Sequence, residues 1–263
     1  MRAYWAILCV RFQMLLQYRL AAVAGFGTQL AWGFIRVMIF AAFYRSTTTA
    51  QPMTYPQVVT YIWLGQAFLA MLPWSPDRDV SVMIRSGNVA YELTRPLDLY
   101  NYWFCRVLAL RTAPTLLRAT PMFIIAGLFF GMQPPSSLWA GFAFLAAMLC
   151  ALVLGCAITN LLSVSLLWTV SGEGTVILMT AAATFFSGLV IPLPLFPAWA
   201  QGTLRLLPFS GLADLPYRLY TGNLPVSATG WVLLLQLIWT GIFVVLGRWL
   251  LSHGVRRLVV QGG

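Results

Sequence analysis

Residues 119–172, ATPMFIIAGLFFGMQPPSSLWAGFAFLAAMLCALVLGCAITNLLSVSLLWTVSG, contain no Asp, Glu, Lys or Arg. A helix needs about 20 apolar residues to cross the hydrocarbon core of a bilayer, so this run has room for two crossings. The turn-forming residues 131–137, GMQPPSS, divide the run near its first third. The stretch therefore predicts a pair of membrane-spanning helices.

The rest of the chain has the same apolar character. Hydrophobic residues make up 60% of it and charged residues 8%, with a mean hydropathy of +0.81, whereas soluble domains average about 25% charged residues. The alternating segments of a membrane β-barrel are absent from the apolar runs. We expect an all-α polytopic membrane protein in which residues 1–263 form a single transmembrane domain. Further runs without charged residues cover 46–76, 174–204 and 219–247.

The predicted architecture has six transmembrane helices with both termini in the cytoplasm. All sixteen basic residues are arginine, and twelve lie on one side of the predicted spans, against only Arg45, Arg205 and Arg218 on the other. Such a bias marks the cytoplasmic side of membrane proteins. The net charge of +10 is explained by this orientation and by anionic headgroups, so we expect no nucleic acid partner. The spans are expected at about 20–44, 56–73, 108–131, 138–168, 175–193 and 229–251.

Two features near the N-terminus each leave two interpretations open. Residues 4–18 carry apolar side chains on one helical face, which indicates either an N-terminal interfacial helix on the inner leaflet or a cytoplasmic extension of the first span. Arg36 lies inside the first span. It either serves the substrate or gating, or reaches the headgroups with its long side chain or faces a partner subunit.

The longest polar segment within the chain, residues 77–98, contains four of the six acidic residues and lies on the predicted cytoplasmic side. Gly87 can supply a tight turn, Asn88 can cap a short helix over residues 89–94, and Pro96 ends that helix. We expect this helix to dock a soluble partner. The alternative is a solvated loop with incidental charge.

Five prolines interrupt an apolar stretch of about 35 residues between the fifth and sixth spans. This composition is too apolar for an exposed loop and predicts a re-entrant outer segment, which is tolerated only where protein or water covers its backbone. Gly188 and Pro192 are expected to mark the break after the fifth span. The prolines are Pro192, Pro194, Pro197, Pro208 and Pro216.

Several kinds of chemistry are excluded. The chain has no lysine, which a nucleotide-binding P-loop requires. Its one histidine, His253, follows the last span, and its four cysteines show no metal-ligand spacing. We therefore expect no catalytic residue, no metal site and no cofactor on this chain. No acidic residue lies in the middle of a predicted span to couple transport to an ion, so energy is expected to come from another subunit.

Three segments resemble permease subunits of the ABC-2-type exporter family, in particular its six-span bacterial branch. They are residues 84–97, IRSGNVAYELTRPL; residues 186–192, FSGLVIP; and residues 207–222, which begin with Leu-Pro-Phe and end with Tyr-Thr-Gly. The resemblance implies that residues 1–263 are one transmembrane permease domain in the bacterial cytoplasmic (inner) membrane. It also implies a dimer with a second copy or a related permease, and cytoplasmic ATP-binding subunits that hold ATP and Mg. The substrate would be a hydrophobic or amphiphilic compound.

The resemblance also implies roles for particular residues. The helix within 84–96 would couple the permease to the ATPase, and the segment after Pro192 would form the outer gate together with Gly188 and Pro197. A secondary carrier or channel that works without ATP, and a membrane assembly protein that transports nothing, remain as alternatives. The residues expected at the coupling interface are Arg85, Gly87, Val89, Glu92, Leu93 and Arg95.

Overall fold

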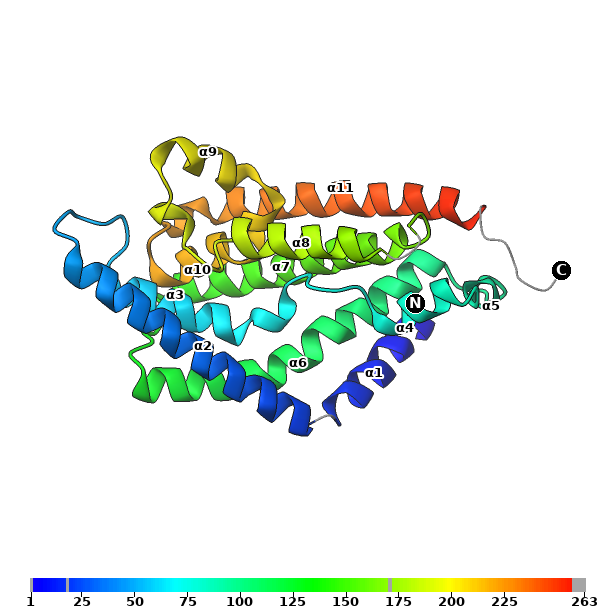
Figure 1. Ribbon diagram of the computed structural model, residues 1–263, viewed down its shortest axis with the longest axis horizontal. Helices are drawn as coiled ribbons and strands as arrows, with labels where there is room; N and C mark the ends of the chain where they lie inside the picture. The colour runs from blue at the N-terminus through cyan, green and yellow to red at the C-terminus, as the bar shows by residue number, and fades with distance from the viewer. Residues whose placement is uncertain (1, 18, 170–171, 257–263) are drawn as a thin grey trace.

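The computed structural model describes residues 2–17, 19–169 and 172–256, and every regular element in these ranges is a helix. The helices form one elongated bundle whose long members run roughly along its length (Figure 1). Four helical segments of the described chain are long and apolar enough to cross a membrane. They comprise most of α2 (Arg19–Ser46) and the whole of α6 (Leu99–Phe129), α7 (Leu138–Ser165) and α11 (Thr229–Val255).

Two of the six predicted spans coincide with shorter helices. The predicted span 56–73 corresponds to α3 (Tyr55–Ala67) and the 3₁₀ turn η1 (Leu69–Met71), and the predicted span 175–193 corresponds to α8 (Glu173–Phe186). Helix α3 begins where Thr54 and Gln57 form a reciprocal capping box. Helix α8 ends seven residues earlier than predicted, because the chain turns at Gly188.

Helix α6 begins at Leu99, nine residues before the predicted span, because the Asp98 side chain accepts a hydrogen bond from the Asn101 N–H at 2.8 Å. Its 31 residues rise about 46 Å at 1.5 Å per residue, which exceeds the hydrocarbon thickness of about 30 Å. Part of α6 therefore extends beyond a bilayer core.

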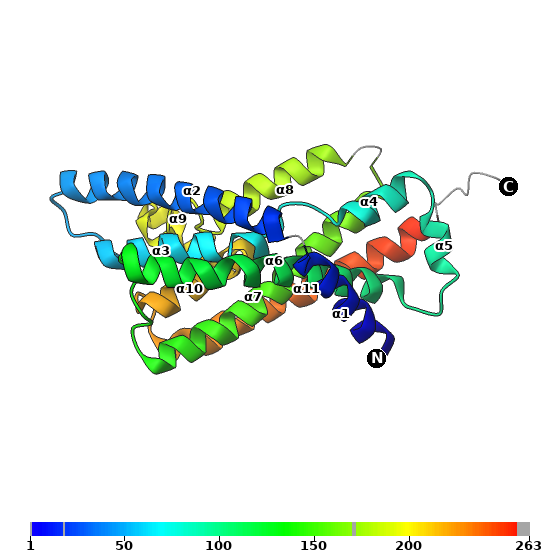
Figure 2. The same ribbon diagram turned by 90° about the horizontal axis from the view of Figure 1, so that it is seen from below.

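Helix α1 (Arg2–Leu16) leaves α2 at a sharp angle and packs against α6 (Figures 1 and 2). The Tyr4 hydroxyl accepts a hydrogen bond from the Asp98 N–H at 2.9 Å, which fixes α1 to the start of α6. The N-terminal helix is thus a separate element, and the alternative of a straight extension of the first span does not describe it.

The two ends of the bundle differ. One end, the α5 end, carries α4 (Arg78–Arg85) and α5 (Val89–Leu93), and the opposite end, the α10 end, carries α9 (Ala198–Leu206) and α10 (Asp214–Thr221) (Figure 1). The arginines that the sequence assigns to opposite sides follow this division. Arg78, Arg85 and Arg95 belong to the α5 end, and Arg45, Arg205 and Arg218 belong to elements of the α10 end.

The bundle core is built around α7, which packs against α11, α10 and α6. A second centre is α3, whose residues from Val58 to Ala67 are all buried. Gly33 of α2 lies directly against the Trp63 ring, since a Cβ atom at this glycine would overlap the ring. Small residues at such crossings allow two membrane helices to approach closely.

Candidate functional site

The polar segment at the α5 end folds as two helices joined by a left-handed turn. Helix α4 begins after Asp77, whose side chain accepts the Asp79 N–H at 2.9 Å, and Gly87 has a φ of +73° that favours glycine. The sequence predicted only the second helix and assigned its cap to Asn88. The structure corrects both points: α4 is an additional helix, and the Asn88 side chain makes no capping hydrogen bond.

One side of this segment is buried against the bundle. Val80 of α4 and Val89 of α5 both have 0% exposure and join a cluster with Trp103 of α6, Val164 of α7 and Leu251 of α11. The expectation that Val89 belongs to the coupling interface therefore needs correction. Val89 points into the chain's own core because α5 has to bury one side to hold its position.

The other side is exposed and partly apolar. Val82 is 56% exposed, Tyr91 73% and Leu93 44%, and the exposed arginines Arg85 and Arg95 accompany them. Exposed apolar side chains at the polar end of a membrane protein are typical of a protein contact. We call these five residues the α4–α5 surface. Glu92 lies beside it, and its Oε2 forms an ion pair with Arg95 Nη1 at 3.2 Å.

A cluster of four charged side chains holds the start of α4. Asp77 Oδ2 accepts from Arg106 Nε of α6 at 2.9 Å, and Asp79 Oδ2 accepts from Arg106 Nη2 at 2.8 Å and from Arg11 Nη2 of α1 at 2.6 Å. Burial alone would raise the pKa of Asp79, but the hydrogen bonds and charges of Arg106 and Arg11 outweigh it and leave the pKa below its usual value. The cluster ties α4 to two other helices.

At the α10 end, the segment after α8 folds back onto the bundle. Gly188 has a φ of +80°, and a Cβ atom there would lie 2.6 Å from the Tyr61 hydroxyl oxygen. Pro192 then precedes the 3₁₀ turn η2 (Leu193–Leu195), and Pro197 precedes α9. Of the three residues predicted for the outer gate, Pro192 and Pro197 thus precede new helical segments, and Gly188 makes the close contact with Tyr61.

Asp214 is the centre of this end. It is fully buried, and its Oδ1 lies 3.0 Å from the Tyr61 hydroxyl and accepts the Leu193 N–H at 2.9 Å. Its Oδ2 accepts from Arg218 Nη1 at 3.3 Å, and Arg218 Nε donates to Asn223 Oδ1 at 2.7 Å. These bonds join α3, η2 and α10, and every residue of α10 is buried.

Sequence reasoning missed the charged clusters at both ends. At the α5 end, the sequence feature that could have indicated the cluster is the pair Asp77 and Asp79, which follows a long apolar run. In the structure this pair binds arginines more than 25 positions away in the sequence. At the α10 end, Asp214 and Arg218 are spaced four apart on a short helix. Among the described residues, no group of three or more His, Cys, Asp or Glu side chains is arranged to hold a metal ion.

Comparison with known proteins adds one positive finding. A family model described as an ABC-2 family transporter protein matches residues 30–262, which is most of the chain. No curated protein matches the chain significantly. The matched region begins within α2 and contains α3, α6, α7, α8 and α11 in full, in agreement with the resemblance of the sequence motifs. The chain therefore belongs to the ABC-2 family of transporter proteins and is a multi-pass membrane permease of that family.

Proposed function

We propose that the chain is the membrane-spanning subunit of an ATP-driven exporter, and that a separate ATP-hydrolysing subunit docks on the α4–α5 surface. The observation that supports this proposal most is that α4 and α5 have both exposed and buried side chains. Their outer side exposes Tyr91 and Leu93, and their inner side is buried in a core shared with α6, α7 and α11. A contact at Leu93 would act on several long helices at once.

The charged cluster supports the same role. Force applied to α4 would pass to α6 through the Asp77–Arg106 pair and to α1 through the Asp79–Arg11 pair. Packed protein interiors deform little, so such a connection transmits displacement rather than absorbing it. In this proposal ATP and Mg are bound by the partner, because this chain has no lysine for a phosphate-binding loop.

We propose further that the permease has six membrane crossings with both termini in the cytoplasm of a bacterial cell. Helices α3 and α8 would supply the two crossings beyond the four long helices. Each rises only about 20 Å, and the proposed re-entrant segment from η2 to α10 would fill the remaining depth at the α10 end. One backbone group of this segment, the Leu193 N–H, donates to the buried Asp214 carboxylate at 2.9 Å, and a re-entrant segment needs such cover of its backbone.

A dimer with a second copy or a related permease completes the proposed transporter. Helix α8 supports this arrangement, since it exposes Ile177 by 68% and Leu178 by 72%. Apolar side chains on this helix can face lipid or a second permease, and both surroundings are apolar. The proposed substrate is a hydrophobic or amphiphilic compound.

The docking surface is tested by placing an acidic residue on it. We expect Leu93→Asp to abolish co-purification with the ATPase subunit and to remove the stimulation of ATP hydrolysis by the permease, since truncating a central interface residue typically costs about 2 kcal/mol or more. The matched control is Val226→Asp, which introduces the same charge at a 38% exposed valine near the α10 end. Full coupling in Leu93→Asp would contradict the α4–α5 surface as the docking site, whereas a wild-type permease without any ATPase partner would favour a carrier that works without ATP.

A further inference from the structure

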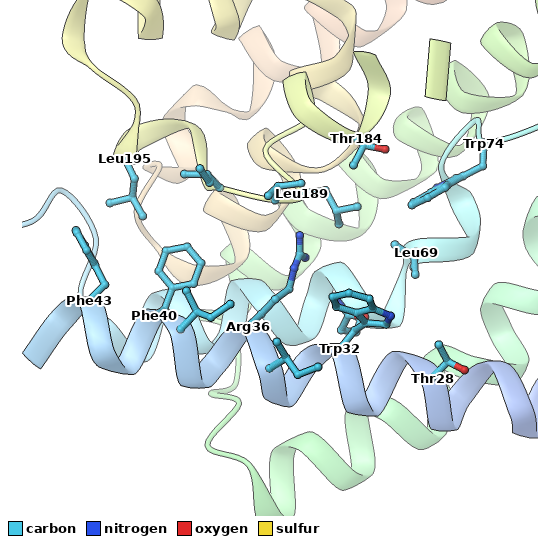
Figure 3. Close-up of a pocket in the computed structure, with 15 residues that line it drawn as sticks. Thr28, Trp32, Arg36, Phe40, Phe43, Leu69, Trp74, Thr184, Leu189 and Leu195 are labelled. Carbon is cyan, nitrogen blue, oxygen red and sulfur yellow. The ribbon is translucent and has the colours of Figure 1, made fainter. Parts of the chain in front are cut away.

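A groove of about 960 Å³ opens beside Arg36, between α2 and the segments that follow α3 and α8 (Figure 3). Its α2 wall runs from Thr28 to Phe43, and its opposite wall includes Leu69, Trp74 and Leu189. The volume lies at the upper end of the range of small-molecule pockets. No residue of the α4–α5 surface lines the groove, and neither Asp214 nor Arg218 does.

Among the residues that the structure describes, Arg36 is the only charged one that lines the groove. Its side chain rises from α2 toward Leu189 and points across the groove (Figure 3). Within residues 2–17, 19–169 and 172–256, the Arg36 guanidinium makes no hydrogen bond and no ion pair. A cation in an apolar, partly desolvated place is costly unless an anion accompanies it.

Two further polar atoms of lining residues also lack a partner among the described residues. Gln66 is 2% exposed, and its Oε1 atom is buried without a hydrogen bond. The indole Nε1 of Trp74 is likewise buried without a hydrogen bond. Buried polar groups in folded proteins nearly always have a partner. Both atoms have almost no accessible surface, so the group of the lining that can meet a charged ligand in the groove is the Arg36 guanidinium.

The remaining lining is apolar and rich in aromatic residues, including Trp32, Phe40 and Phe43. Such walls suit a hydrocarbon chain or a ring system. A contact with lipid headgroups does not explain the position of Arg36. The end of α2 at Ser46 lies about 15 Å further along the helix at 1.5 Å per residue, and the Arg36 side chain points across the groove.

We infer that this groove binds an anionic amphiphile, whose carboxylate, phosphate or sulfate group pairs with Arg36 and whose apolar part lies against Trp32 and Phe40. Guanidinium groups bind such oxyanions through short, charge-assisted hydrogen bonds. Both an acidic bilayer lipid and an acidic transported compound have this chemistry. If the ligand is the transported compound, the inference rests on the proposed function and adds that this compound is anionic. If the ligand is a bilayer lipid, the inference does not depend on that function.

The test is binding of 11-(dansylamino)undecanoate to the purified full-length permease in nanodiscs of phosphatidylcholine. The matched probe is its methyl ester, which has the same chain and fluorophore without the charge. We expect Arg36→Gln to weaken binding of the acid by about tenfold or more and to leave binding of the ester nearly unchanged. Arg36→Lys keeps the charge and should retain most of the affinity. The control is Arg45→Gln, which removes an exposed arginine outside the groove on the same helix.

The source of the ligand is resolved by adding phosphatidylglycerol to the nanodiscs. Competition with the acid probe in the wild type, lost in Arg36→Gln, would identify an acidic lipid as the occupant. Tight binding of the acid without competition would identify a transported acid. Both results support an anionic amphiphile at Arg36.

Equal binding of the acid by the wild type and Arg36→Gln would overturn the inference, as would equal loss of the ester in that variant. The measurement needs no ATPase subunit. If the acid probe does not depend on Arg36 but the permease still stimulates the ATPase, only the ligand of the groove is wrong. If the acid probe binds through Arg36 but no ATPase partner exists, only the proposed energy source is wrong.

Discussion

Asp77 Oδ2 lies 2.9 Å from Arg106 Nε, and the two side chains are only 2% and 11% exposed. This pair joins the residue that starts α4 to the second turn of the long helix α6. A helix that serves only as a solvated connector needs no such attachment. The pair is therefore a buried link between α4 and the membrane-spanning bundle.

Breaking this pair should uncouple the permease without removing its docking surface. We expect Asp77→Asn to lower the free energy of unfolding by about 1–3 kcal/mol, because Arg106 loses a buried charged acceptor, and to reduce permease-stimulated ATP hydrolysis while the ATPase subunit still co-purifies. The control is Asp98→Asn, since the Asp98–Arg248 pair is 3.7 Å long and 46% exposed on both sides. Such a pair contributes little. Equal effects of the two variants would show that the Asp77–Arg106 pair has no special role.

The Asp79 contacts should make the stability of the α1–α4 contact depend on pH. The pKa of Asp79 is lower in the folded protein than its usual value, so the ionised form stabilises the fold above the pKa of a free aspartate, about 3.9. This contribution is lost as the pH falls through the lower folded-state pKa. Asp79 is 52% exposed, so the effect is at most about 1 kcal/mol. The difference in thermal stability between the wild type and Asp79→Asn should be present at pH 6 and disappear as the pH falls through the folded-state pKa of Asp79.

Gly188 should tolerate no side chain, for two separable reasons. Its φ of +80° disfavours any other residue, and an added Cβ would also meet the Tyr61 hydroxyl at 2.6 Å and Asp214 Cβ at 3.0 Å. Gly131 has a similar φ of +71° with open space around it. We expect Gly131→Ala to cost about 1–2 kcal/mol and Gly188→Ala to cost clearly more, measured as loss of folded protein on heating in detergent. Equal costs would show that the contact with Asp214 is loose.

The proposed topology predicts which positions a membrane-impermeant thiol reagent reaches in intact cells. In a variant without the native cysteines, Thr48→Cys and Ser136→Cys should react from outside, since both residues are exposed in loops of the α10 end. Ser86→Cys, between α4 and α5, should react only after the membrane is opened. Reaction of Ser86→Cys in intact cells would contradict cytoplasmic placement of the α4–α5 surface.

The apolar runs and arginine distribution predicted the helical class, the approximate places of the long helices and a short helix near residue 89. The long helices could be predicted because their apolar composition extends over 20 or more consecutive residues. The start of α6 at Leu99 was less predictable, because the aromatic and charged residues 99–107 do not resemble a hydrocarbon-embedded span, although Asp98 is a recognisable cap.

The inward orientation of Val89 and the partners of Asp77 could not be predicted in the same way. A five-residue helix has too few positions for an apolar pattern to identify its buried side. The contact between Asp77 and Arg106 depends on how α4 crosses α6, and that crossing is set by packing of Val80 and Trp103 rather than by any pattern within residues 77–98.

Photocrosslinking from position 91 in the assembled transporter shows whether an ATPase subunit binds the α4–α5 surface. Tyr91 is 73% exposed, so the larger side chain of p-benzoylphenylalanine can be placed there, and the same replacement at Val226 serves as the control. We expect a crosslink from position 91, and none from position 226, to a subunit that mass spectrometry shows to contain a nucleotide-binding P-loop. A purified complex that retains the ATPase subunit but crosslinks to it from neither position, or only from position 226, would show that the subunit binds elsewhere.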